Sequence, residues 1–156
     1  MIIKTYENTQ RKEFLKMLIT YLNDDMKFNW SSEFIEDKIL GLFEEKWSKK
    51  ILYIDVLEEN KQLIGFAIYQ IDTPQSDWCK KEGWGFVREL YIQKDYRKQG
   101  YGYKLVKNIE RRLINENVKD IYLNADDAII FWNKCNYINT NEVDSDGMYT
   151  LIKNVH

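Results

Sequence analysis

The alternation of apolar and polar residues along the chain predicts a mixture of strands and helices. Apolar residues that recur every three to four positions are typical of helices with one buried face. Shorter apolar runs, bounded by polar and turn-forming residues, predict strands. We expect strands at residues 2–6, 51–57, 63–71, 84–92, 120–124, 137–141 and 148–153, and helices after residue 8 or 9, after residue 31 or 32, at 101–116 and at 128–136.

Residues at several predicted boundaries are of types that begin helices or close turns. Asn8 or Thr9 can cap the first helix, and Ser31 or Ser32 can cap the second. The polar segment 58–61 predicts the turn of a hairpin between the second and third strands. The resulting order of elements is βααβββαβαββ.

A short basic loop with two glycines lies between the fourth predicted strand and the third predicted helix. Its sequence is Arg97-Lys98-Gln99-Gly100-Tyr101-Gly102. A strand, loop and helix in this order point free backbone N–H groups and the positive end of the helix dipole at one spot, where a phosphate can bind. A Walker loop is excluded because the chain has no Gly-Lys pair. A dinucleotide fingerprint is excluded because segment 83–88 lacks the third glycine and precedes a strand.

Length and composition favour a single domain that spans residues 1–156 and works in the reducing cytoplasm. Of these 156 residues, 44% are hydrophobic and 15% are aromatic, which is typical of a globular protein. We expect no membrane association, because no apolar run is long enough to cross a bilayer. We expect no signal peptide, because the N-terminus lacks the pattern of one. Cys79 and Cys135 lack metal or redox spacing. The only histidine is His156, so we expect no metal site and no catalytic histidine.

Charge is distributed unevenly along the chain, although the net charge is only −2. Residues 23–60 contain ten acidic and five basic residues, whereas residues 94–119 contain eight basic and three acidic residues. The basic segment can meet phosphates and the acidic segment can meet a cationic amine. Both segments can equally be helices with ordinary solvated faces. The acidic net charge argues against a nucleic-acid partner.

From about residue 50 to the C-terminus the chain resembles the GCN5-related N-acetyltransferase (GNAT) superfamily. The resemblance is carried by the glycine loop 97–102 and by four further segments in the expected order, 62–67, 89–92, 121–124 and 128–137. It implies an α/β (α+β) protein with the acyl-CoA N-acyltransferase fold. That fold has a mixed, mostly antiparallel central sheet of about seven strands, flanked by four helices. It also implies that acetyl-CoA is the cosubstrate and that the molecule is a monomer or a homodimer.

The resemblance implies which residues hold the coenzyme. The loop cradles the pyrophosphate, and a main-chain N–H near a bulge in the fourth strand faces the thioester carbonyl. Ala125 stands where the family commonly has an asparagine, so Asn124 is the candidate for that contact. The implied coenzyme-binding residues are Leu90, Tyr91, Ile92, Arg97, Lys98, Gln99, Gly100, Tyr101, Gly102 and Asn124.

Acetyl transfer to an amine needs a base, because an alkylammonium has no lone pair at neutral pH. The family often places a glutamate on the fourth strand for this purpose, and Glu89 is the candidate here. The usual general-acid tyrosine is replaced by Trp132, whose indole N–H cannot release a proton. Trp132 either packs in the core, with water or another tyrosine protonating the thiolate, or marks a non-catalytic acyl-CoA-binding module.

The resemblance implies that the acceptor pocket is lined by the segment between the first two helices and by the loops after the third and sixth strands. Aromatic walls with carboxylates suit a small-molecule amine such as a polyamine or aminoglycoside. A protein N-terminus or lysine is an alternative acceptor. The candidate acceptor-binding residues are Asp25, Phe28, Trp30 and Trp84, and the same segments contribute Tyr21, Asp24, Trp78, Asp144 and Asp146.

Overall fold

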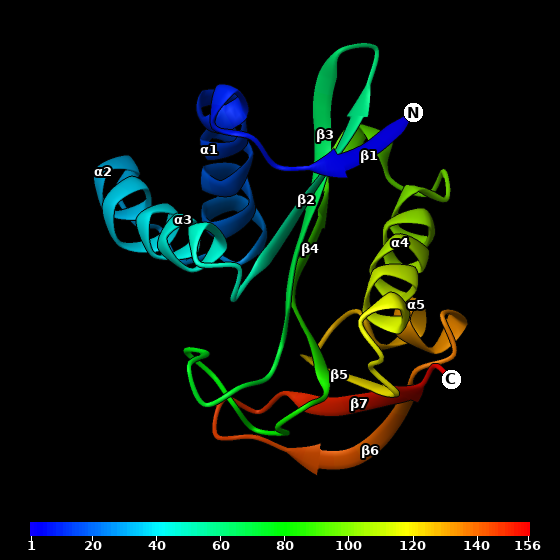
Figure 1. The fold of residues 1–156 in the computed structure, drawn as a ribbon. Coiled ribbons are helices and arrows are strands. Elements are labelled where there is room, and N and C mark those ends of the chain that lie inside the picture. Colours follow the sequence, from blue (N-terminus) through cyan, green and yellow to red (C-terminus); the bar gives the residue numbers. More distant parts are fainter.

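A seven-stranded sheet forms the centre of the protein in the computed structural model, which describes residues 1–156. The strands are β1 (Ile2–Thr5), β2 (Tyr53–Glu59), β3 (Gln62–Ile71), β4 (Gly85–Ile92), β5 (Asp120–Ala125), β6 (Ile138–Val143) and β7 (Tyr149–Asn154). They lie in the order β1-β2-β3-β4-β5-β7-β6 (Figure 1). Neighbouring strands are antiparallel except β4 and β5, which are parallel.

Four helical bodies cover the two faces of this sheet. The helices are α1 (Arg11–Thr20), α2 (Ser32–Phe34), α3 (Gly41–Ser48), α4 (Tyr101–Asn115) and α5 (Ile129–Lys134). A π-helical segment, Tyr21–Asp25, extends α1, and another, Ile35–Leu40, joins α2 and α3 into one body. The N-terminal helices lie on one side of the sheet, and α4 and α5 lie on the other (Figure 1).

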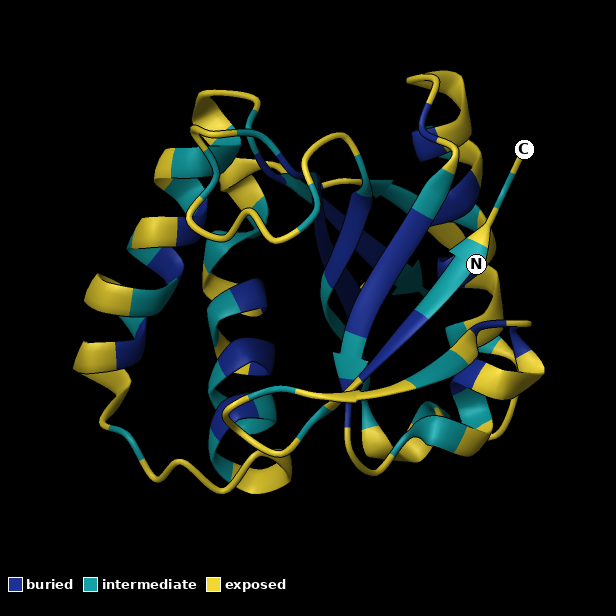
Figure 2. Cartoon of the chain, turned by 90° about the horizontal axis from the view of Figure 1, so that it is seen from below, coloured by how far each residue is buried: buried dark blue, intermediate teal, exposed yellow.

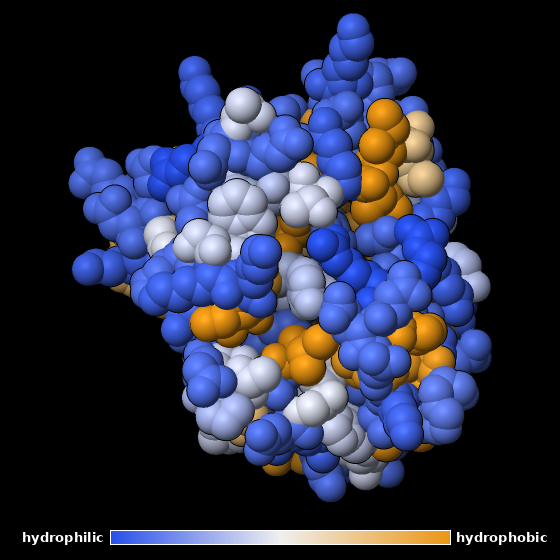
Figure 3. Space-filling model, viewed as in Figure 1, coloured by the Kyte–Doolittle hydropathy of each residue, from blue (hydrophilic) through white to orange (hydrophobic).

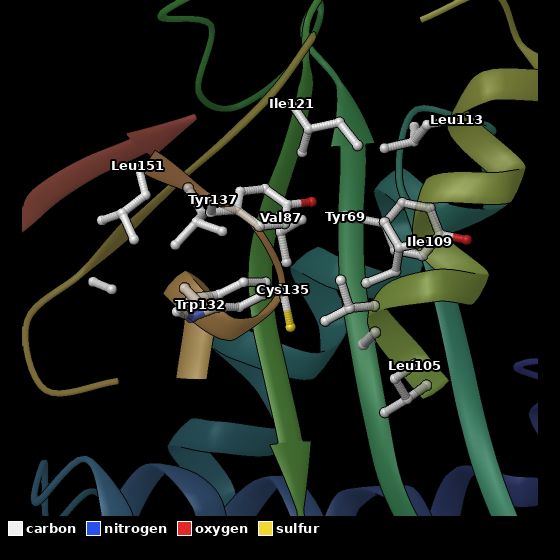
Figure 4. Packing of buried hydrophobic residues seen from close by; sticks show 14 of the residues in the cluster. Tyr69, Val87, Leu105, Ile109, Leu113, Ile121, Trp132, Cys135, Tyr137 and Leu151 are labelled. Atoms are coloured by element: carbon white, nitrogen blue, oxygen red, sulfur yellow. The ribbon is translucent and has the colours of Figure 1, made fainter. Parts of the chain in front are cut away.

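Each face of the sheet has its own hydrophobic core, and β3 contributes to both. Phe66 and Ile68 pack with the N-terminal helices, whereas Ala67 and Tyr69 pack with α4 and α5. Residues of β3 are buried continuously from Leu63 to Gln70, because a strand covered on both faces has no polar side (Figure 2). Figure 4 shows the core on the α4 and α5 side.

Local signals in the sequence were accurate at some boundaries and wrong at one. Ser31 caps α2 as predicted, since its Oγ accepts a hydrogen bond from the Phe34 N–H at 3.1 Å. The first helix is not capped by Asn8 or Thr9. A 3₁₀ turn at Asn8–Gln10 precedes α1, and the Glu7 N–H donates to Gln10 Oε1 at 2.9 Å.

The middle of the sheet opens between β4 and β5. These strands pair only at Gly85–Ile121 and Phe86–Tyr122, and beyond this point they separate (Figure 1). On the other edge of β4, Ile68 pairs with Glu89 and Tyr69 pairs with Val87, so Arg88 is the extra residue of a bulge. The fourth strand therefore contains a bulge, as the resemblance implies. The extra residue lets Arg88 and Glu89 both face the N-terminal helices.

The observed architecture confirms the predicted fold class of a mixed seven-stranded sheet with four helical bodies. None of the helices has both the length and the apolar composition needed to cross a bilayer.

Candidate active site

The basic glycine loop joins the end of β4 to the start of α4 through a 3₁₀ turn at Lys94–Tyr96. Gly100 immediately precedes α4 and has φ +86°, a left-handed conformation that glycine adopts without strain. The backbone N–H groups of Gln99 and Gly100 donate no backbone hydrogen bond. Together with the first turn of the 15-residue helix α4, they can receive an anionic group.

The second glycine of the loop has a packing role. A Cβ at Gly102 would lie 3.1 Å from the ring of Phe131 on α5, closer than ordinary van der Waals contact. Gly102 therefore allows the start of α4 to lie directly against α5. Tyr101 turns the other way, and its hydroxyl donates to Glu59 at 3.0 Å.

Arg97 is already engaged by protein atoms. Its Nε donates to the carbonyl oxygen of Ile92 at 2.7 Å, and its guanidinium lies 5.6 Å from the centre of the Tyr91 ring. Its Nη2 forms an ion pair with Asp25, at the end of the π-helical segment that follows α1. Lys98 and Gln99 are exposed. The ion pair joins the acceptor-side segment directly to the glycine loop, which the sequence did not predict.

Glu89 lies on the face of β4 that is covered by the N-terminal helices. The hydroxyl of Tyr21 donates a hydrogen bond to Glu89 Oε2. Burial has the largest effect on this carboxyl and raises the pKa of Glu89. The hydrogen bond from Tyr21 and the charge of Arg88 lower the pKa, but by less. A carboxylate held in this way is a stronger base than an exposed glutamate.

Further carboxylates surround this pair. Asp24 and Asp25 lie close enough to Tyr91 to raise the pKa of its hydroxyl, after the larger effect of burial. Burial and Glu89 raise the pKa of Tyr21, and the charges of Asp25 and Asp127 add to the effect. The loop after β5 thus brings a carboxylate, Asp127, to the region of Tyr21. The site has an anionic rim above two tyrosine rings.

On the side of the molecule seen in Figure 1, exposed apolar side chains form small separate patches among polar ones (Figure 3). A hollow of about 400 Å³ is lined by α1, the start of β3, Tyr91 and residues 93–95. A second hollow of about 340 Å³ lies at the other end of β3, next to Tyr53 and Ile71. Glu89 lines neither of them.

Comparison with known proteins identifies the family. The sequence profile of the acetyltransferase (GNAT) family matches residues 15–137. The chain belongs to this family. No curated protein sequence matches it.

Solved structures of GNAT proteins share the fold over nearly the whole chain. The PaiA N-acetyltransferase of Thermoplasma acidophilum, in complex with coenzyme A, has a TM-score of 0.75 at 14% identity, with 98% of each chain covered. An aminoglycoside 6'-N-acetyltransferase complexed with coenzyme A has a TM-score of 0.77 at 13% identity, and the match covers 100% of this chain and 98% of the other. An aminoglycoside 6'-acetyltransferase type Ii has a TM-score of 0.73 at 18% identity, with the same coverage. At identities this low, the structural similarity shows the common fold alone.

As a member of the GNAT family, the protein is an N-acetyltransferase that uses acetyl-CoA. The glycine loop fits the pyrophosphate of that molecule. The Gln99 and Gly100 N–H groups have no backbone acceptor, and the space where a Gly100 side chain would stand is open for 4 Å. Leu90 and Ile92 point their side chains into the α4 side, so they would contribute only main-chain groups to a bound coenzyme. Asn124 Oδ1 accepts from Thr150 Oγ1 at 3.1 Å, so its amide oxygen faces β7.

Trp132, at the position of the usual GNAT tyrosine, is part of the core. Its side chain is 6% exposed and packs nearly edge-on against Phe131 and Tyr137, with ring centres 5.1 Å away in both cases. Figure 4 shows Trp132 beside Tyr137 in this core. The structure therefore shows Trp132 packed in the core.

The structure brings only some of the expected acceptor residues close to Glu89. Asp25 lies at the rim, and Phe28 stacks on Trp30 with ring centres 4.3 Å apart in the segment that follows. Trp84 lies beyond the opposite end of β4, where its ring meets Tyr122 at 6.3 Å. Trp78 is exposed, and Asp146 lies in the turn between β6 and β7.

Asp144 serves mainly to shape that turn. Its Oδ1 accepts hydrogen bonds from the N–H groups of Asp146 and Met148, both at 2.9 Å, and these hold the pKa of Asp144 below its usual range. Asp144 also approaches Lys80 of the β3–β4 loop at 4.0 Å, so the two loops meet.

Proposed function

We propose that this protein transfers the acetyl group of acetyl-CoA to a primary amine of a small cationic molecule, such as a polyamine or an aminoglycoside. The proposal rests on one observation above all. Glu89, a partly buried carboxylate with a raised pKa, lies on β4 close to where that strand separates from β5.

Glu89 would act as the base. An alkylammonium with a pKa of about 10.4 is almost entirely protonated at pH 7 and cannot attack a carbonyl. Acetyl-CoA supplies the acetyl group as a reactive thioester. A carboxylate that accepts the proton of the ammonium, directly or through one water, makes the nitrogen lone pair available where the thioester lies. Burial supports this role because it raises the pKa of Glu89 toward neutrality.

The rim of the site supports a cationic acceptor. Asp24, Asp25 and Asp127 lie around Tyr21 and Tyr91. Carboxylates attract a second or third ammonium group of the acceptor, and tyrosine rings add cation–π contacts. Two of the similar structures are aminoglycoside 6'-acetyltransferases, but the low identity restricts that likeness to the fold. The acceptor class is inferred from the charge at the site.

The leaving thiolate is protonated by water in this proposal. Trp132 cannot supply a proton, and its position in the core keeps it out of the reaction. A thiolate is a fair leaving group because the pKa of a thiol is only about 8.5. The absence of the usual tyrosine should therefore slow the reaction without preventing it.

The test is release of thiol from acetyl-CoA with polyamines, aminoglycosides, amino acids and N-terminal peptides as acceptors. We expect turnover with polyamines or aminoglycosides. Glu89→Gln should lower kcat/KM about 100-fold at pH 7. Glu33→Gln, which removes an exposed carboxylate from α2, should not change it. Turnover with peptides alone would replace the small-molecule proposal, and equal rates for Glu89→Gln and the wild type would remove Glu89 from the mechanism.

A further inference from the structure

Tyr21 is fixed in place by the elements around it. It begins the π-helical segment that extends α1, and short π-helical segments are frequent at functional sites. Its ring packs against Phe66 of β3 and Tyr91 of β4, with ring centres 5.7 and 5.4 Å away. These contacts leave the hydroxyl in one position, where it donates to Glu89 Oε2.

The two oxygens of Glu89 are therefore not equivalent. Oε2 accepts the hydrogen bond from Tyr21, which is the only side-chain hydrogen bond to this carboxylate. No fully buried side-chain oxygen of the protein lacks a partner, so Oε1, which accepts none, retains contact with solvent. The free oxygen is the one that can meet the acceptor amine.

We infer that Tyr21 is a positioning residue for Glu89, whose hydroxyl fixes the carboxylate with Oε1 turned toward the acceptor. The inference rests on the proposed role of Glu89 as the base. Tyr21 lies 68 positions away from Glu89 in the sequence, on the segment that also forms the acceptor rim.

The hydrogen bond also influences the pKa of Glu89, and with it the pH at which Glu89 can act. Burial favours the neutral carboxyl, whereas the Tyr21 hydroxyl and the charge of Arg88 favour the ionised form. The groups facing Tyr21 are Glu89, Asp25 and Asp127, all of them acidic. Removing the hydroxyl takes away one of the two groups that favour ionisation, so the pKa of Glu89 should rise. Because only the ionised carboxylate is a base, the acidic limb of the activity profile should move to higher pH.

The first test is the pH profile of kcat/KM for Tyr21→Phe, which keeps the ring and its contacts with Phe66 and Tyr91. We expect the acidic limb to move up by about one pH unit, with KM for acetyl-CoA unchanged. Tyr6→Phe is the matched control, since Tyr6 is buried in the same hydrophobic core and donates to a different glutamate, Glu44, at 3.0 Å. Its profile should match the wild type.

A double variant separates positioning from a general structural effect. In a Glu89→Gln background, Tyr21→Phe should cause no further loss of activity, because the group it positions is gone. An additional loss as large as in the wild-type background, or a Tyr21→Phe profile identical to that of the wild type, would overturn the inference.

A titration without turnover distinguishes this inference from the proposed function. The carboxyl carbon of Glu89 can be followed by ¹³C NMR against pH in the free protein, with Glu89→Gln to assign the signal. A higher pKa in Tyr21→Phe together with no acetylation of any amine would refute the proposed acceptor and retain the coupling. An unchanged pKa of Glu89 in an active enzyme would refute the role of Tyr21 and leave the proposed function in place.

Discussion

Gly100→Val should separate coenzyme binding from folding. Gly100 has φ +86°, and a Cβ placed there would meet no atom within 4 Å. The cost to the fold is therefore backbone strain without a steric clash. A non-glycine residue in the left-handed region costs about 1–3 kcal/mol, which for a chain of this size lowers the melting temperature by roughly 2–12 °C.

Gly147 provides the matched control. It lies in the turn between β6 and β7 with φ +80°, and a Cβ there would also meet no atom within 4 Å. Gly147→Val should therefore destabilise the fold by a similar amount. Urea denaturation of both variants measures this, and a much larger loss for Gly100→Val would contradict the strain estimate.

The two variants should differ in their affinity for coenzyme A. Valine at position 100 relieves its strain by leaving the left-handed region, which turns the loop N–H groups away from the phosphate, and its side chain enters the space left open there. Loss of one hydrogen bond to a charged group costs about 1.5–3 kcal/mol, which is a rise in Kd of roughly 10- to 150-fold. Isothermal titration calorimetry should show this for Gly100→Val and wild-type affinity for Gly147→Val. Equal affinities would refute the assignment of the loop.

Three further predictions concern other parts of the molecule. Asp25→Asn should tighten coenzyme binding by up to about fivefold in calorimetry, because Arg97 would no longer have to leave its ion pair with Asp25 to reach a phosphate. Weaker binding would contradict this and show that Asp25 supports the loop. Asp55→Ala should lower the free energy of unfolding by about 2–4 kcal/mol, because buried Asp55 accepts hydrogen bonds from three side chains of β3 and α4. Urea denaturation measures this, and a change below about 1 kcal/mol would contradict it. A thiol reagent should label exposed Cys79 in the folded protein, and buried Cys135 only after unfolding. Mass spectrometry identifies the labelled residues, and labelling of both cysteines in the native protein would refute this prediction.

Glu89→Gln also has a predicted pH dependence. Without a base, the reaction depends on amine that is already deprotonated in solution. That fraction rises about tenfold per pH unit up to the pKa of the amine, about 10.4. The variant should therefore approach the wild-type rate at high pH, and a pH profile parallel to that of the wild type would contradict the base role.

The order of the elements and the glycine loop could be predicted from the sequence because their signals are local. Leu105, Ile109 and Leu113 recur every four residues and are all fully buried on α4. In the loop, Gly100 takes the left-handed conformation that glycine adopts without strain. These signals depend on backbone geometry within a few residues. The contact of Gly102 with Phe131 of α5, in contrast, was decided by tertiary packing.

The arrangement around Glu89 was decided by the tertiary structure. Glu89 was a candidate from its position on a strand, but its hydrogen bond with Tyr21 joins residues 68 positions apart, and the ion pair of Arg97 with Asp25 joins residues 72 apart. Which face Glu89 takes depends on the bulge at Arg88, whose position is set by the pairing of β4 with β3. Strand register and helix packing depend on the free energy of the whole sheet with its helices. They therefore cannot be predicted from any short segment of the sequence.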